Sequence, residues 1–336
     1  MSSTIKDIAK ELGISPSTVS RALSDNKNIS EKTKKKVKKV AKKLNYQKNT
    51  WASALRTKKT KLLGVIVPSL KNPFFAHAIS GMQQIANKEE LRIVICQSNE
   101  SFESEITQLQ TLIASGAEGI IVSVAAETKN FDHFKAVEEK GIPVIYFDRG
   151  VDENGVNQVE ADDFNAGMIA TQHLIDQGCK RLAHLAGPLH LRNSRKRKEG
   201  FEEAIKKNNF KLSEQFIIET GYESSAFKDE WAERLANATP PVEGIFAVSD
   251  HIAIAAMKRL QKNGVKLPED IKIIGFGRNE FGELVTPTLS TVTQMPEKIG
   301  RESVNMYLDV QKTGIQSSMS RQILTEAKLI ARESSR

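Results

Sequence analysis

Small hydroxyl side chains and one arginine gather in residues 13–23, GISPSTVSRAL. Hydroxyl groups and a helix N-terminus bind phosphate oxygens, and an arginine can donate two parallel hydrogen bonds to the edge of a guanine. Ser17 and Arg21 lie four residues apart, so a helix would place them on one face. These residue types suit contact with a DNA duplex. The same letters also fit a well-capped helix whose arginine simply faces solvent.

The elements that must position these residues are three short helices. The first is predicted by the capping box of Thr4 and Asp7, by Gly13 as its end, and by an apolar face of Ile5, Ile8, Ala9 and Leu12. The second is predicted by Ser15 as its cap, by Pro16 at its first position, and by Val19, Ala22 and Leu23. The third is predicted by Ser30 as its cap and by Val37, Val40, Ala41 and Leu44. Two helices joined by a tight turn with glycine predict a helix-turn-helix, whose second helix lies in the DNA major groove.

The positive charge of the chain is concentrated at its beginning. The 336 residues carry a formal net charge of +8, whereas residues 1–61 alone hold seventeen Lys and Arg against four Asp and Glu. This balance is +13, so the remaining 275 residues carry −5. Phosphate contacts need cations gathered on one small surface, so the distribution favours a nucleic-acid-binding head on an acidic body. The alternative for KTKKKVKKVAKK is a solvated, lysine-rich helix.

The overall composition is that of a globular protein. Hydrophobic residues make up 39% and charged residues 27%, and the length suggests two or three domains. Only two cysteines occur, Cys96 and Cys179, so neither a disulfide framework nor a zinc cluster is indicated. The first 25 residues contain no apolar core of a signal peptide, and no window approaches 18 apolar residues. We therefore expect a cytoplasmic protein without a membrane partner.

The segment TIKDIAKELGISPSTVSRALSD resembles the N-terminal signature of the lactose/galactose repressor family of bacterial transcription regulators. About twenty consecutive positions agree in type and spacing, and the likeness continues to LIARESS near the end of the chain. The resemblance implies a sequence-specific DNA-binding regulator, typically a repressor, whose operator affinity is controlled by a small-molecule effector. It also implies a homodimer on near-palindromic double-stranded operator DNA. Whether the effector releases DNA or promotes binding stays open.

The segment after the third helix, NYQKNTWASALRTKKT, resembles the hinge of this family. It agrees with Tyr-x-Pro-Asn-x-x-Ala-Arg-x-Leu at four positions but has Lys48 for the proline and Ser53 for the arginine. By resemblance, Leu55 is the wedge that a pair of hinge helices inserts into the minor groove. A flexible linker is the alternative. The candidate DNA contacts are Thr4, Ser15, Pro16, Ser17, Thr18, Ser20, Arg21, Asn28, Tyr46, Asn49, Ala52 and Leu55.

From Leu62 onward, short apolar runs alternate with helix-like stretches, as in LLGVIVP, RIVIC, GIIVSV, PVIYF, RLAHLAG, GIFAVS and IKIIGF. This order predicts parallel sheets of βαβ units with ligands at the carboxyl ends of the strands. The resemblance implies a two-lobed, periplasmic-binding-protein-like core. We therefore predict an α/β fold with a helix-turn-helix domain (1–49), a hinge (50–61), a first lobe (62–160 and 290–320) and a second lobe (161–289 and 321–336).

Polar and aromatic residues follow several of these predicted strands. Arg197 agrees with the family's Arg-x-x-Gly-Phe, and Arg195 agrees with a second frequent arginine. By resemblance, the set forms a sugar site with aromatic faces against the ring and polar groups on its hydroxyls. Local ion pairs, core packing and a solvated helix start are the alternatives for single residues. The candidate effector contacts are Asn72, Phe74, Phe75, Asp148, Arg149, Arg195, Arg197, Ser249, Asp250, Arg278 and Gln294.

One segment departs from the family pattern. The family has Gly-Phe/Tyr-Asp followed by Asp or Asn at the last strand of the second lobe, whereas this chain reads GFGRNE. Gly277 and Arg278 thus stand where acids are expected. This departure motivates the hypothesis of an anionic effector, a sugar acid or phosphorylated sugar, bound by Arg278 with Arg149 and Arg197.

The alternative class of function is a doubly wound α/β enzyme with a basic, nucleic-acid-binding tail. The sequence holds no GxxxxGK, HExxH or Gly-x-Ser-x-Gly motif. Its six histidines, at 77, 133, 173, 184, 190 and 251, form no pair at i, i+3 or i+4 spacing. We therefore expect no enzyme, no metal and no cofactor. A transport-type sugar receptor is a further alternative, but the basic segment of residues 1–61 would have no function in such a receptor.

Overall fold

The computed structural model describes residues 3–46, 60–211, 216–222, 224–277, 280–314 and 320–336. The chain divides into two compact units, residues 1–60 and residues 61–336. We call the first the head and the second the body, and describe each by itself. The candidate hinge positions Asn49, Ala52 and Leu55 lie outside the described residues.

The head consists of the three predicted helices, α1 (Ile5–Leu12), α2 (Pro16–Leu23) and α3 (Glu31–Lys43). Their facing sides form one small core of Ile8, Ala9, Val19, Ala22, Val37 and Ala41. Asp7 Oδ2 accepts hydrogen bonds from Thr4 N–H at 2.7 Å and from Thr4 Oγ1 at 2.8 Å, as the capping box predicts. Gly13 ends α1 with a left-handed φ of +63°. The predicted helix-turn-helix is therefore confirmed.

An ion-pair cluster fastens α3 to the turn after α2. Lys34 Nζ lies 3.1 Å from Asp25 Oδ1 and 2.8 Å from Glu31 Oε1, and the Lys34 residue is buried. Hydrogen bonds to Glu31 and Asp25 raise the pKa of Lys34. The orientation of α2 relative to α3 thus depends on charge pairing as well as on the apolar core.

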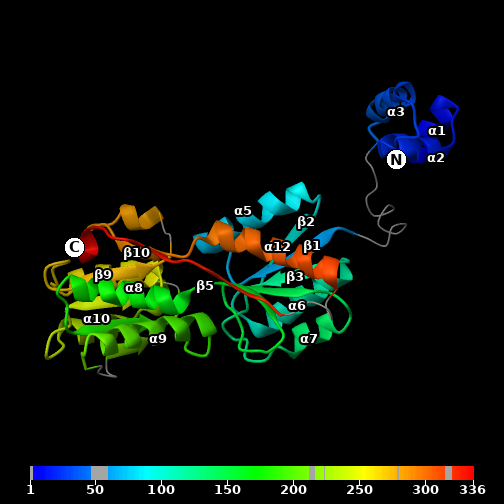
Figure 1. Ribbon diagram of the computed structural model, residues 1–336. Helices are drawn as coiled ribbons and strands as arrows, with labels where there is room; N and C mark the ends of the chain where they lie inside the picture. The colour runs from blue at the N-terminus through cyan, green and yellow to red at the C-terminus, as the bar shows by residue number, and fades with distance from the viewer. Residues whose placement is uncertain (1–2, 47–59, 212–215, 223, 278–279, 315–319) are drawn as a thin grey trace. The chain divides into compact units, whose positions relative to one another are not determined.

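The first lobe of the body is a parallel sheet covered by helices on both faces. Its strands lie in the order β11 (Gln322–Thr325), β5 (Asn157–Ala161), β4 (Val144–Phe147), β3 (Gly119–Val122), β1 (Leu62–Val67) and β2 (Arg92–Gln97). One face packs on α5 (Pro73–Lys88) and α12 (Pro296–Thr313), which lie side by side in Figure 1. The other face packs on α6 (Phe102–Ala114) and α7 (Asp132–Glu138).

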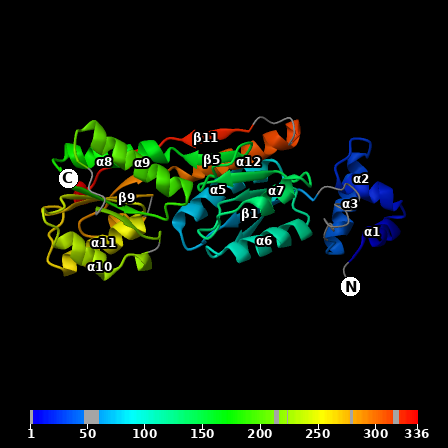
Figure 2. The same ribbon diagram turned by 90° about the horizontal axis from the view of Figure 1, so that it is seen from below.

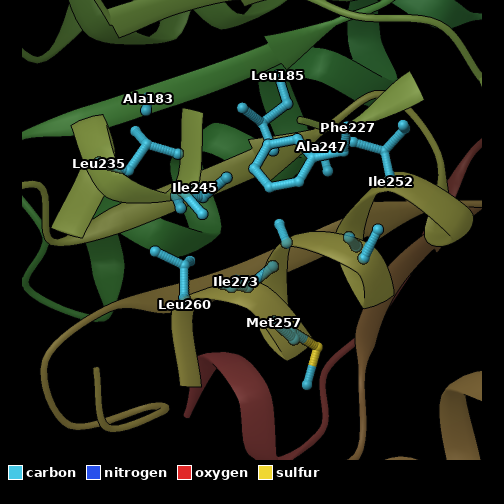
Figure 3. Packing of buried hydrophobic residues seen from close by; sticks show 14 of the residues in the cluster. Ala183, Leu185, Phe227, Leu235, Ile245, Ala247, Ile252, Met257, Leu260 and Ile273 are labelled. Carbon is cyan, nitrogen blue, oxygen red and sulfur yellow. The ribbon is translucent and has the colours of Figure 1, made fainter. Parts of the chain in front are cut away.

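The second lobe repeats this architecture with one antiparallel edge strand. Its order is β12 (Lys328–Ile330), β10 (Ser290–Thr293), β9 (Lys272–Phe276), β8 (Gly244–Ala247), β6 (Leu182–Ala186) and β7 (Ile217–Glu219), and only β12 runs antiparallel. Helices α8 (Asp163–Asp176) and α9 (Arg192–Lys207) cover one face, as Figure 2 shows from below. Helices α10 (Asp229–Ala236) and α11 (Asp250–Lys262) cover the other, around Phe227 in Figure 3. Short 3-10 turns complete the lobe at Ser224–Ala226, Glu280–Glu283 and Glu333–Ser335.

Two strands near the end of the chain belong to the opposite lobe from the one predicted. Strand β10, placed in the first lobe by the predicted limit at residue 290, pairs in parallel with β9 of the second lobe. Strand β11, placed in the second lobe, pairs in parallel with β5 of the first. The chain therefore crosses between lobes at 161–163, 293–296 and 325–328. The sheet that a strand joins depends on contacts with strands far away in the sequence, and a local apolar pattern carries no information about these contacts.

Glycines bring the helices of each lobe into backbone contact. A Cβ at Gly200 of α9 would lie 2.0 Å from the Phe164 carbonyl oxygen of α8. A Cβ at Gly300 of α12 would lie 1.9 Å from the Ala78 carbonyl oxygen of α5. The close approach at Gly200 brings the middle of α9 against the first turn of α8, next to an ion pair between the cleft residue Arg197 and Asp163 that is described below.

Candidate functional site

The N-terminus of α2 presents a cluster of hydroxyl groups on the head. Ser15 Oγ accepts a hydrogen bond from Thr18 N–H at 3.1 Å, which caps the helix. The same oxygen lies 2.7 Å from Ser17 Oγ and 2.8 Å from Thr18 Oγ1. Pro16 occupies the first helical position, as predicted. The helix start is therefore rigid, polar and free of bulky side chains, so that a phosphate backbone can approach it closely.

The candidate DNA contacts of the head differ in how far their side chains are exposed to solvent. Thr4, Ser15, Pro16, Ser17, Arg21 and Asn28 are exposed, whereas Thr18, Ser20 and Tyr46 are half-buried. Thr4 is engaged with Asp7, and Tyr46 packs against the core of the head. Arg21 has no ion pair within the described residues, so its guanidinium group is available to a ligand.

The second candidate site is a cleft in the body at the carboxyl ends of the strands of both lobes. Its walls include Asn72, Phe74 and Phe75 from the start of α5, and Asp148 and Arg149 after β4. The second lobe contributes Arg197, Ser249, Asp250 and Gln294. The enclosed space between them is about 60 Å³, and it is about 530 Å³ when the open mouth of the cleft is included. Apart from Arg195 and Arg278, all predicted effector contacts are thus brought together.

Asp148 and Arg149 are held in place from behind the cleft. Arg149 donates two parallel hydrogen bonds to Glu100, from Nη1 at 2.6 Å and from Nη2 at 2.8 Å, and its guanidinium lies 4.8 Å from the ring centre of Tyr222. Ser123 Oγ donates to Asp148 Oδ2 at 3.2 Å. Asp148 has a left-handed φ of +61°, a conformation that Asp tolerates better than most residues. Burial raises the pKa of Asp148, while Arg149 and Arg197 oppose the shift.

Arg197 is likewise paired before any ligand binds. Its Nε donates to Asp163 Oδ1 at 2.8 Å and its Nη1 to the Val248 carbonyl oxygen at 2.9 Å. The guanidinium lies 3.7 Å from the ring centre of Phe276. Burial raises the pKa of Asp163, whereas the charge of Arg197 opposes this. The family's Arg-x-x-Gly-Phe pattern has a physical basis here, because Gly200 lets α9 approach α8 closely enough for this ion pair.

Several polar cleft residues also begin helices. Asn72 Oδ1 accepts from Phe74 N–H at 3.0 Å and caps α5, and Ser249 Oγ accepts from Ile252 N–H at 3.2 Å and caps α11. Asp250 Oδ1 accepts from Thr291 Oγ1 at 2.7 Å. These side chains therefore serve the fold, and they face the cleft because helix N-termini follow the carboxyl ends of parallel strands.

Two predicted effector contacts are not part of the described cleft. Arg195 lies outside it and hydrogen-bonds Asp152, a residue of the first lobe. The reason is helical geometry, since Arg195 is two residues from Arg197 and therefore faces another side of α9. Arg278 lies outside the described residues, so its part in an anion site stays a prediction. Of the other two arginines in that hypothesis, each already has a carboxylate partner.

The sequence analysis missed four cleft residues with polar or aromatic side chains: Asn193, Tyr222, His251 and Phe276. Asn193 could have been found, because it lies four residues before Arg197 and so on the same face of α9. It accepts a hydrogen bond from Tyr222 Oη at 2.9 Å. Tyr222 lies in an irregular loop before a 3-10 turn, where no periodic pattern marks it.

The described part of the chain contains no group of three or more His, Cys, Asp or Glu that could hold a metal ion. No helix there is long and apolar enough to cross a membrane.

Comparison with known proteins assigns both units. Residues 4–49 match the family model described as bacterial regulatory proteins, lacI family. Residues 60–333 match the model of periplasmic binding proteins and the sugar binding domain of the LacI family.

Individual relatives match over nearly their whole length. The ribose operon repressor of Halalkalibacterium halodurans is 31% identical over 308 residues, which is 91% of this chain and 89% of the relative. The HTH-type transcriptional repressor PurR of Vibrio vulnificus is 27% identical over 306 residues, which is 91% of each chain. The solved structure of the lac repressor dimer bound to operator and the anti-inducer ONPF has a TM-score of 0.88 over 100% of this chain and 99% of that chain. Its identity is 22%, so it supports the fold.

Proposed function

Because the chain belongs to the lacI family of bacterial regulatory proteins, we propose that it binds operator DNA through its head and a neutral sugar in the cleft of its body. The relatives are named as transcriptional repressors, which favours a regulator over the alternative of an enzyme. The sugar changes the affinity for DNA, and the protein acts in the cytoplasm, where the operator is.

The head supports the DNA-binding half of this proposal. Its second helix begins with three small hydroxyl side chains and carries the exposed Arg21 one turn further on. A recognition helix reads bases with the residues of its N-terminal turns, and arginine is the commonest reader of guanine. Arg21 is therefore proposed to contact a base, and the hydroxyl cluster to contact phosphates. Leu55 is proposed as the minor-groove wedge on the strength of the family resemblance alone.

The charge balance of the cleft supports a neutral ligand. Arg149 and Arg197 face the cleft, but Glu100 and Asp163 neutralise them from behind. Two further carboxylates, Asp148 and Asp250, line the cleft. An added phosphate or carboxylate would meet this acid-rich surrounding with no unpaired cation among the described cleft residues. The pairing of both arginines is the observation that carries the proposal.

The remaining lining suits a sugar. Phe74, Phe75 and Phe276 offer apolar surfaces for the C–H faces of a ring, and Asn72, Asn193 and Gln294 offer amide groups for its hydroxyls. The relative that is 31% identical is named as a ribose operon repressor. We therefore propose a small monosaccharide, and D-ribose is the first to test.

Thermodynamic linkage explains how sugar binding changes the affinity for DNA. Both lobes contribute to the cleft, so a bound sugar favours one relative position of the lobes over others. If that position changes how the two heads of a dimer fit two operator half-sites, the sugar changes the affinity for DNA. DNA then changes the affinity for the sugar by the same factor. The direction of this effect depends on which state binds DNA better.

The proposal includes a homodimer. The edge strand β2 exposes Val94 and Ile95, which are 37% and 36% exposed, and Leu284 of the second lobe is 78% exposed. An open edge with apolar side chains is a site for association in a soluble protein. Sedimentation velocity at micromolar concentration is expected to show a dimer, and replacement of Val94 and Ile95 by lysine is expected to shift the population toward monomer.

Calorimetric titration tests the ligand class. The protein is titrated with D-ribose and D-glucose, and separately with D-ribose 5-phosphate and D-glucuronate. We expect saturable binding of a neutral sugar and its loss in Arg149→Met. Absence of saturable binding for both neutral sugars would refute the neutral-sugar proposal, and saturable binding of D-glucuronate alone would revive the anionic hypothesis built on Arg278.

A further inference from the structure

A second cavity lies where the chain crosses from β10 of the second lobe to α12 of the first. Its volume is about 290 Å³, and none of its lining residues lines the effector cleft. Lys298 and Arg301 enter it from the first turns of α12, and Lys328 enters it from β12. Lys298 and Arg301 are three residues apart and share one face of the helix. Lys328 lies opposite Thr293 in the antiparallel pairing of β10 with β12.

Among the described residues, the three cations of this cavity form no ion pair. Within the described residues, none of them has a carboxylate oxygen within 4 Å. Arg301 Nη1 donates a hydrogen bond to an amide oxygen, Gln84 Oε1, at 3.4 Å. Glu297 also lines the cavity, with its Oε1 3.1 Å from Nδ1 of His77 on α5, so three cations and one carboxylate give the lining a net charge of +2.

This excess of positive charge is unusual for the body of this protein. Outside residues 1–61 the chain carries a net charge of −5, and its buried arginines, Arg149 and Arg197, are each paired with an acid. Three unpaired cations that converge on one cavity repel one another. A bound anion removes that repulsion and gains several charge-assisted hydrogen bonds.

We propose that this cavity is a second ligand site, which binds a small metabolite through a phosphomonoester group. Arginine and lysine together suit a phosphate dianion, since Arg301 can donate two parallel hydrogen bonds and the lysines act as point charges. Met295 and Ile330 form an apolar wall, which leaves room for a short carbon chain beside the phosphate.

The position of the site gives it a regulatory consequence. Arg301 and Lys298 belong to α12, which packs on the first lobe, whereas Lys328 belongs to a strand of the second lobe. A phosphate held by both would bias the relative position of the lobes. Thr293 lines this cavity and the next residue, Gln294, lines the effector cleft. A ligand that binds one lobe arrangement better than another shifts the equilibrium toward it, so the two sites are coupled.

The test is a titration of the full-length protein with glycerol 3-phosphate, with glycerol as the uncharged control. Sodium chloride is added so that the titrations with glycerol 3-phosphate and with glycerol have the same ionic strength. We expect saturable binding of glycerol 3-phosphate alone, weakened at least tenfold in the variant K298Q/R301Q and in K328Q. The matched variant K258Q/K262Q removes two exposed charges from α11 and is expected to bind as the wild type does.

Three outcomes would overturn the proposal. One is the absence of saturable binding in the wild type. Another is equal weakening in K298Q/R301Q and in K258Q/K262Q, which would show a general charge effect of the kind that the basic head also produces. The last is displacement of glycerol 3-phosphate by the neutral sugar with unchanged affinity in K298Q/R301Q, which would place the phosphate in the effector cleft.

Discussion

Arg197 and Asp163 form an ion pair in which Nε lies 2.8 Å from Oδ1 and both side chains are almost fully buried. Asp163 is the first residue of α8 and Arg197 lies in the second turn of α9, so the pair ties these two helices together behind the cleft. The guanidinium also stacks on Phe276 at the end of β9. One side chain thus joins three elements of the second lobe and presents a neutralised surface to the ligand.

Removal of Arg197 is expected to destabilise the protein because it leaves a buried, unpaired carboxylate. For Arg197→Met we expect a loss of about 3–5 kcal/mol in the free energy of unfolding, the usual range for breaking a buried pair. The double variant with Asp163→Asn is expected to recover part of this loss, since the uncompensated charge is gone. Urea unfolding of the wild type, the single variant and the double variant measures these differences in the free energy of unfolding. Equal stability of Arg197→Met and the wild type would show that the pair is not formed.

Ion pairs that cross between the lobes are expected to strengthen sugar binding. Asp152 of the first lobe hydrogen-bonds Arg192 and Arg195 of α9, and Arg192 Nε lies 3.3 Å from Glu160 Oε2. Because these groups are partly exposed, we expect Asp152→Asn to weaken binding of the sugar only two- to fivefold. Calorimetry measures the change. The control is Glu202→Gln, which breaks the pair of Lys198 with Glu202 inside α9. Equal sugar affinities of Asp152→Asn and Glu202→Gln would show that the ion pairs between the lobes do not strengthen sugar binding.

Arg21 is expected to act in DNA recognition rather than in folding. Its side chain is exposed, so Arg21→Ala should leave thermal stability unchanged while it weakens specific DNA binding by about 10- to 100-fold, or 1–3 kcal/mol. Arg21→Lys keeps the charge but not the two parallel hydrogen bonds, so it should recover non-specific binding only. Fluorescence anisotropy with specific and scrambled duplexes separates the two effects. Full specificity in Arg21→Lys would argue against base contact.

His184 is expected to make the protein less stable in mild acid. The ring is completely buried between Phe201 and Phe246, at centroid distances of 5.2 and 4.7 Å, and burial lowers the pKa of His184 to about 4. The unfolded chain, with a histidine pKa near 6.5, binds this proton more readily, so stability is lost as the pH falls from about 6.5 toward 4.

Between pH 7.5 and pH 5 this single group should contribute a decrease of about 2 kcal/mol. His184→Phe keeps an aromatic ring between the two neighbours and removes the titration. Comparison of the two pH profiles of urea unfolding cancels the contributions of other groups. If both proteins lose the same stability between these pH values, the ring does not titrate as its burial demands.

The parts of the fold that rest on local signals could be predicted from the sequence. Caps at Thr4, Ser15 and Ser30 and the glycine after Leu12 place the three head helices, because a helix end satisfies its backbone groups with nearby side chains. The cleft residues after β1, β4, β8 and β10 could be placed for a similar reason. Ligand contacts in parallel sheets follow the carboxyl ends of strands.

The parts that rest on distant contacts could not be predicted. Glu100 and Asp163 neutralise the cleft arginines across 49 and 34 positions of sequence, and no local pattern links such partners. The hypothesis of an anionic effector, which starts from Gly277 and Arg278, uses Arg149 and Arg197 without these partners. The sheet partners of β10 and β11 were misplaced for the same reason. Arg195 was assigned by resemblance, although its spacing from Arg197 places it on another side of α9.

The coupling of sugar and DNA is tested most directly by one binding measurement. A duplex is first selected from a random pool by the purified protein, and its binding is followed by anisotropy over a range of salt concentrations, with and without the sugar found by titration. We predict sequence-specific binding whose affinity falls with salt and changes at least fivefold, in either direction, on addition of the sugar. No preference for any duplex at any salt concentration, or an affinity that the bound sugar leaves unchanged, would contradict the account.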